Sequence, residues 1–132
     1  MEIYCLEDFK VAFEKLATKK SYRDLESQII GYFFNKTPAE LASGTRLNHS
    51  NTTPYIKKRL AGSGGYRTYY LLIIREDSLY LMFVHPKTGK SGSSNITDES
   101  KAYLYKKVLE AIEDNSLYRV TEDSGKLIFE KN

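Results

Sequence analysis

The apolar residues in the first third of the chain are spaced as in a short strand followed by two helices. The opening segment EIYCL is rich in β-branched and aromatic residues, which favour an extended conformation. Two stripes at helical spacing follow, Phe9, Phe13 and Leu16 and then Leu25, Ile29 and Phe33. The second stripe ends near Pro38, which discourages further helix. This part of the chain therefore predicts one strand and two helices.

The period of the apolar residues shortens from Thr45 onward, as expected for strands. Successive segments are rich in Tyr, Ile, Leu and Val: TRLN, YIKKRL, GYRTYYLLIIRE and SLYLMFVH. They are separated by the turn-forming clusters HSNTTP, AGSGG and EDS. Because such short connections join antiparallel neighbours, this region predicts a meander of three or four strands.

The last third of the chain predicts a helix and a hairpin. Thr97 is suited to cap the helix, since Asp98 and Glu99 follow in its first turn. The side chains expected to face inward are Ala102, Tyr105, Val108, Leu109 and Ile112. Two apolar runs around DSG predict a hairpin in residues 115–132.

These elements together predict an α+β fold in a single domain, residues 1–132, with residues 115–132 as a C-terminal hairpin extension. We expect a small antiparallel or mixed sheet of about four to six strands. An N-terminal helical hairpin and one C-terminal helix are expected to pack on it.

Composition indicates in which cellular compartment the chain is expected. Its 132 residues are 41% hydrophobic, which is enough to form a core. The single cysteine, Cys5, excludes an internal disulfide. The N-terminus lacks the order of a signal peptide, and no apolar run approaches the ~20 residues of a membrane span. We therefore expect a cytoplasmic protein without membrane contact.

Positive charge is concentrated in the middle of the chain. Residues 45–90 carry eight Lys or Arg against Glu76 and Asp77, a local charge of +6, whereas residues 1–44 and 91–132 carry −1 and −2. Both histidines also lie in this middle region. A localised field of this sign attracts polyanions more strongly than the overall charge of +3 would.

The glycine cluster GSGG lies between two of the cationic strands. It lacks the third glycine of a dinucleotide motif and the GK[ST] ending of a phosphate loop, and no helix follows it. We therefore interpret it as a hairpin turn that lays YIKKRL and GYRTYYLLII side by side.

Strand alternation then divides the cations between two faces. Lys57 and Arg59 share one face of YIKKRL, whereas Lys58 lies on the face of the apolar core residues. On the next strand Arg67 shares its face with Tyr69 and further apolar residues. An arginine in such surroundings is unfavourable unless an anion or an acidic side chain accompanies it.

The strand SLYLMFVH ends with a histidine, and more cations follow. Pro86 biases His85 toward an extended conformation at the rim of the sheet, and Lys87 and Lys90 come next. Histidine exchanges a proton near neutral pH. No metal-ligand spacing or nucleophile elbow accompanies it, so we expect neither a metal nor a cofactor.

These residues suit a metal-free reaction on an RNA phosphodiester. In that reaction a base deprotonates the ribose 2′-hydroxyl, cations stabilise the pentacoordinate phosphorus, and an acid protonates the leaving 5′-oxygen. Arginine fits the second task because its planar fork holds two phosphate oxygens. The tyrosines of the chain could stack on unpaired bases.

The segment KKRLAGSGGYRTYYLLIIREDSLYLMFVHPKTGKSGSSNITDESKAYLYKKVL resembles the RelE/ParE superfamily of bacterial toxins from type II toxin–antitoxin pairs, especially its RelE and HigB branches. The shared pattern is a basic strand, a glycine turn, GYR before an apolar strand, a strand ending in histidine with nearby lysines, and an acid-capped helix. It covers residues 44–109, and the two N-terminal helices agree with the helical hairpin of that family.

The resemblance implies a small sheet with helices on one side and a basic cleft on the other. It implies a ribosome-dependent endoribonuclease that cuts mRNA, leaves a cyclic phosphate, and is silenced by a cognate antitoxin in a hetero-oligomer. The catalytic positions of the family correspond to Lys57, Arg67 and His85. Substrate-binding positions are assigned to Arg59, Tyr69, Lys87 and Lys90.

Two departures from the family pattern leave alternatives open. The loop PKTGKSGSSN is long, and a hairpin follows the last helix where many members end. One alternative is a binding protein of the same fold, either a gyrase inhibitor as in the ParE branch or an RNA-binding domain without chemistry. The other is an α+β domain whose cations are only solvated.

Overall fold

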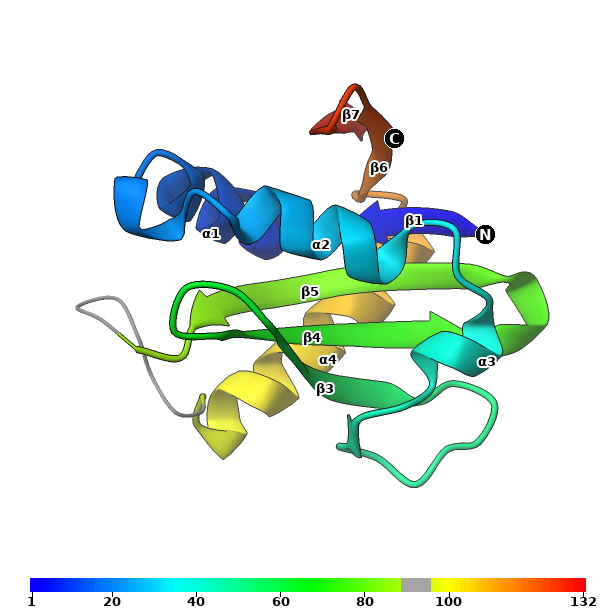
Figure 1. The fold of residues 1–132 in the computed structure, drawn as a ribbon. Coiled ribbons are helices and arrows are strands. Elements are labelled where there is room, and N and C mark those ends of the chain that lie inside the picture. The colour runs from blue at the N-terminus through cyan, green and yellow to red at the C-terminus, as the bar shows by residue number, and fades with distance from the viewer. Residues whose placement is uncertain (89–95) are drawn as a thin grey trace.

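A computed structural model describes residues 1–88 and 96–132 of the chain as helices packed on a single mixed sheet (Figure 1). The helices are α1 (Glu7–Ala17), α2 (Leu25–Phe33), α3 (Pro38–Leu41) and α4 (Asp98–Asp114). The strands are β1 (Glu2–Cys5), β2 (Thr45–Arg46), β3 (Tyr55–Leu60), β4 (Tyr66–Ile73), β5 (Ser78–Pro86), β6 (Tyr118–Asp123) and β7 (Lys126–Lys131). Two short 3-10 turns lie at Lys20–Tyr22 and Ile74–Glu76. The predicted α+β class is confirmed.

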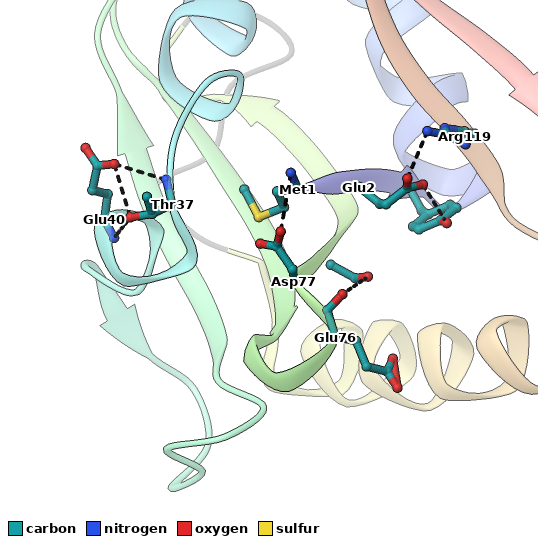
Figure 2. A network of polar contacts seen from close by, with 9 residues as sticks. Met1, Glu2, Thr37, Glu40, Glu76, Asp77 and Arg119 are labelled. Atoms are coloured by element: carbon teal, nitrogen blue, oxygen red, sulfur yellow. Dashed lines mark hydrogen bonds and ion pairs between the residues drawn. The ribbon is translucent and has the colours of Figure 1, made fainter.

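The N-terminal strand joins the two halves of the sheet. The strand order is β2-β3-β4-β5-β1-β6-β7, in which β1 is parallel to β5 and antiparallel to β6. Polar contacts hold β1 in place, with the Met1 amine 3.5 Å from Asp77 and Glu2 paired at 3.0 Å with Arg119 of β6 (Figure 2). The C-terminal hairpin therefore extends the main sheet, which within the described residues has seven strands instead of the expected four to six.

Both faces of the sheet are covered by helices. On one face α1 and α2 bury their stripes, and Phe33 packs edge-on against Tyr70 of β4. The helix α4 covers the other face (Figure 1). It buries Leu104 and Val108 with Tyr69 and Leu71 of β4. The expectation of helices on one side only is therefore wrong. The reason is that β4 is apolar at nearly every position, so a sheet with one bare face would expose half of this strand.

The helix α4 faces the sheet with a different stripe from the one predicted. Its buried residues are Leu104, Val108 and Ala111, whereas Ala102 is exposed and Leu109 is 46% exposed. Two apolar stripes overlap on this helix, and residue type alone did not separate them. The predicted cap is confirmed, because Thr97 Oγ1 accepts a hydrogen bond from the Ser100 amide at 3.0 Å.

The short helix α3 was missed. Pro38 is its first residue, and the proline begins a helix here instead of preventing one. The Glu40 amide donates to Thr37 Oγ1 at 3.3 Å, and the Glu40 carboxylate accepts from the Thr37 amide at 3.0 Å (Figure 2). The signal was present as TPAE, a capping box with proline at the first position.

The glycine cluster forms the predicted turn between β3 and β4, which pair antiparallel from Tyr55↔Leu71 to Leu60↔Tyr66. Asp24, at the start of α2, holds this turn. Its carboxylate accepts a 2.7 Å hydrogen bond from the Ser63 amide and another from the Tyr66 hydroxyl. Gly62 has φ +122°, a conformation that side chains with a Cβ atom rarely adopt.

Replacing Gly62 should destabilise the fold. In Gly62→Ala the new Cβ atom would lie 2.7 Å from Asp24 Oδ2 and from the Tyr66 ring, and the positive φ adds strain. We expect a loss of about 1–3 kcal/mol in the free energy of unfolding, measured by urea denaturation. Gly31→Ala is the control, because Gly31 is helical with nothing within 4 Å of the added atom, so stability should hold or rise. Equal stabilities of the two variants would contradict the prediction.

Candidate functional site

The register of three neighbouring strands brings the predicted basic residues together. Arg59 of β3 pairs with Arg67 of β4, which pairs with His85 of β5. In the adjoining row, Lys57 pairs with Tyr69. Neighbouring strands are ~4.8 Å apart, and alternate residues of a strand ~7 Å apart, so the group has the dimensions of one or two phosphates. We call Lys57, Arg59, Arg67 and His85 the basic cluster.

A bulge in β5 places His85 on the same face as the other three residues. Tyr70 pairs with Leu81 but Tyr69 pairs with Phe83, so Met82 is an extra residue. Strict alternation would put His85 on the face of Leu81, toward α1 and α2. The extra residue reverses the alternation, and Phe83 accordingly packs in the cluster beneath α4.

The cations of the basic cluster lie close together, and no described acidic side chain pairs with them. Arg59 stands directly opposite Arg67, an arrangement of like charges that is unfavourable across a strand pair. Among the described residues neither arginine nor Lys57 forms an ion pair, and buried Arg67 Nε has no hydrogen-bond partner. Desolvation, Arg67 and Lys101 of α4 together lower the pKa of Lys57. An anion bound over these residues would relieve the repulsion.

Both ring nitrogens of His85 are engaged within the protein. Nδ1 donates to the Pro86 carbonyl at 2.9 Å, so the neutral ring accepts at Nε2 from the Tyr69 hydroxyl at 3.0 Å. Burial, countered in part by the bond to Pro86, lowers the pKa of His85, and the charges of Arg67 and Lys57 lower it further. The histidine is therefore neutral near pH 7, and it orients Tyr69.

The two aromatic members of this arrangement are poorly placed to meet an RNA strand. Tyr69, which was assigned to substrate binding, is 0% exposed, so its ring cannot stack on a base. Its hydroxyl is raised in pKa by burial, although a hydrogen bond from the Ile96 backbone and the charge of Arg67 oppose this. His85 is 6% exposed, and this burial favours a positioning role over direct proton transfer to a substrate.

The later lysines border the basic cluster or lie outside the described residues. The Lys87 amide donates to the Gly65 carbonyl at 2.9 Å. This bond places Lys87 at the end of the sheet where the Arg59 guanidinium passes Gly65. Lys90 lies outside the described residues.

Two further lysines, Lys58 and Lys101, lie near the basic cluster in the sequence or in space. Lys58 points to the opposite face, with its Nζ 5.4 Å from the centre of the Tyr32 ring, as alternation predicted. Lys101 of α4 was missed, although its charge acts on Lys57. The sequence near Lys101 does not indicate this, because Lys101 comes close to Lys57 only when α4 packs over the strand face that carries the cations.

The side chains of the basic cluster are cationic or neutral and include no carboxylate or thiol that could bind a metal ion. Among residues 1–88 and 96–132, no group of three or more His, Cys, Asp or Glu side chains is arranged to hold a metal ion. Within the same residues, no helix has both the length and the apolar character needed to cross a membrane.

Models of known protein families and curated protein sequences give no match to this chain.

The lowered pKa of His85 predicts how stability depends on pH. The unfolded chain binds a proton at the ordinary pKa of 6.5, whereas the folded protein binds it only at lower pH. The free energy of unfolding should therefore fall as the pH drops below 6.5 toward the folded value, and be unaffected by this group above that range.

Urea denaturation between about pH 5 and 8 measures this dependence. His85→Gln removes the titrating ring, so its stability should vary less over the window than that of the wild type. His49→Gln, at an exposed loop position, should vary like the wild type. An unchanged pH dependence in His85→Gln would show that other groups cause it.

Proposed function

We propose that the chain is an endoribonuclease that cleaves mRNA by attack of the 2′-hydroxyl, without a metal ion. The observation that supports this best is the basic cluster, in which the side chains of three adjacent strands meet on one face without acidic partners among the described residues. A phosphodiester with its charged oxygens is the ligand that such a group binds most favourably.

Lys57 is suited to act as the general base. Its lowered pKa increases the fraction of neutral amine, which can take the proton of the ribose 2′-hydroxyl. The 2′-oxygen then forms a bond to phosphorus and the bond to the 5′-oxygen breaks. The products are a 2′,3′-cyclic phosphate and a 5′-hydroxyl. Because both His85 nitrogens and the Tyr69 hydroxyl are engaged, water supplies the proton of the leaving oxygen.

Arg67 and Arg59 stabilise the charge that develops on the phosphate oxygens. Arg67 is half-buried, so its charge acts in a medium of lower dielectric constant than water. Arg59 is exposed and holds the phosphate from the solvent side. His85 and Tyr69 act beside them as positioning residues that keep this region of the sheet rigid.

The remaining parts of the proposal rest on the resemblance to RelE-like toxins. They are that the substrate is mRNA on the ribosome, that cleavage stops translation, and that a cognate antitoxin binds the chain in the cytoplasm. The local charge of +6 in residues 45–90 agrees with a polyanionic substrate.

Expression of the protein should arrest growth and produce new RNA 5′ ends, which primer extension or sequencing of cleaved RNA detects. Lys57→Ala and Arg67→Ala should relieve the arrest and lower cleavage in a translation extract by roughly 10²–10³-fold, the usual effect of removing one transition-state donor. The matched control is Lys58→Ala, which removes the neighbouring cation on the other face of the same strand.

Full activity of both Lys57→Ala and Arg67→Ala would refute the catalytic assignment. So would an equal loss in Lys58→Ala, because the effect would then follow net charge and not the face of the sheet. Circular dichroism of each variant separates loss of activity from loss of fold.

A second candidate function is RNA binding without chemistry, favoured by the engagement of both His85 nitrogens. In that case short single-stranded RNA should bind with an affinity that falls steeply with salt, while no cleaved ends appear. Removing Lys57 or Arg67 should each reduce the slope of log affinity against log salt by about 0.7. A slope that is unchanged in both variants would contradict phosphate contact at the basic cluster.

A further inference from the structure

A pocket opens beside the basic cluster, between the residues that follow β2 and the first turns of α4. Its volume is about 520 Å³, within the usual ~300–1,000 Å³ of ligand-binding pockets. The residues that matter here are Arg46, Tyr55, Asp98, Lys101 and Tyr105. Neither the predicted site nor the proposed mechanism uses this pocket.

Two stacked tyrosines form the aromatic part of the wall. The rings of Tyr55 and Tyr105 lie 5.5 Å apart at an interplanar angle of 12°. Tyr55 is 4% exposed, and its hydroxyl donates to the Lys101 carbonyl at 3.0 Å, so its position is fixed. Tyr105 is only half-buried and lies on the outside of the pair. The pocket therefore contains an aromatic ring that is backed by a second ring.

The charged groups that line the pocket are mainly cationic, and hydrogen bonds hold the Arg46 side chain. Arg46 donates to the Ser50 carbonyl at 2.9 Å and to Asn51 Oδ1 at 3.1 Å, which fixes the loop that forms one wall. Lys101 lies 3.7 Å from the fully exposed Asp98 carboxylate, a weak surface pair. A polyanionic strand can enter a pocket with this balance of charge.

The pocket and the basic cluster lie next to each other along β3, because Tyr55 lines the pocket and Lys57 belongs to the cluster. Tyr55 and Lys57 are alternate residues of one strand face, ~7 Å apart. Lys101 contributes to the pocket wall and also acts electrostatically on Lys57. A nucleotide with its phosphate at the basic cluster would thus have its own base, or the next one, within reach of the pocket.

We propose that this pocket binds one unpaired nucleobase of the RNA strand, with the Tyr105 ring as the stacking surface and Tyr55 as its support. The inference rests on the proposed function, since it takes RNA as the ligand of the basic cluster. Every base has a π-face, so stacking of this kind holds the strand without strong sequence preference.

The experiment is a cycle that combines one protein change with one RNA change. Binding of a short single-stranded RNA is measured at low salt for the wild type and for Tyr105→Leu, which keeps apolar contact with Tyr55. The same measurements are made with RNAs that carry one abasic ribose at each position in turn.

At one position of the RNA, loss of the base and loss of the ring should have the same effect. Tyr105→Leu should weaken binding of intact RNA by roughly 5- to 150-fold, the range expected for one base stacked on an aromatic side chain. It should not weaken binding of the RNA that is abasic at that position. Tyr105→Phe should bind like the wild type, and so should Tyr103→Leu. Tyr103 is 52% exposed, does not line the pocket, and donates its hydroxyl to Asp8 Oδ2.

Other outcomes would overturn the inference. They are equal weakening by Tyr105→Leu for intact RNA and for every abasic RNA, no effect of Tyr105→Leu, or no binding of free RNA by the wild type. Cleavage in a translation extract with loss in Arg67→Ala would, in each case, leave the proposed function standing. Absence of both cleavage and binding would refute the two together.

Discussion

The pairing of β3, β4 and β5 is the constraint on which the rest of this structure depends. The pairing Arg59↔Arg67↔His85 sets three basic side chains in one row, and it holds only because Met82 bulges out of β5. Without the bulge His85 would turn into the core beneath α1 and α2, and Tyr69 would lose its hydrogen-bond acceptor. One extra residue thus decides that His85 lies on the same face as Lys57, Arg59 and Arg67.

The basic cluster combines adjacent like charges with a hydrogen-bonded support. Arg59 and Arg67 face each other, and Arg67 is half-buried with an unpaired Nε among the described residues. The support comes from Tyr69 and His85 on the same face, which bond to each other and to the backbone. Such an arrangement is unfavourable in the free protein, and a bound phosphate would convert the repulsion into binding free energy.

The helix α4 covers part of the sheet face on which the cations lie. A sheet with one bare side would present them on an open surface. Here α4 covers the neighbouring apolar residues, and it adds Lys101 and Tyr105 at the border of the cationic region. Hydrogen bonds fix the turn at Gly62, between β3 and β4, and the start of α4 at Thr97.

The sequence by itself determined the local features of the protein. The alternation in YIKKRL separated Lys58 from Lys57 and Arg59. The GSGG turn, the stripes of α1 and α2 and the Thr97 cap were also predicted, because these depend on neighbours within a few residues. Only the tertiary structure decided the seven-stranded order, the face covered by α4, the bulge at Met82, and the burial of Tyr69 and His85. Those features arise from pairing between distant segments, where the free energy of burying both faces of β4 outweighs local preference.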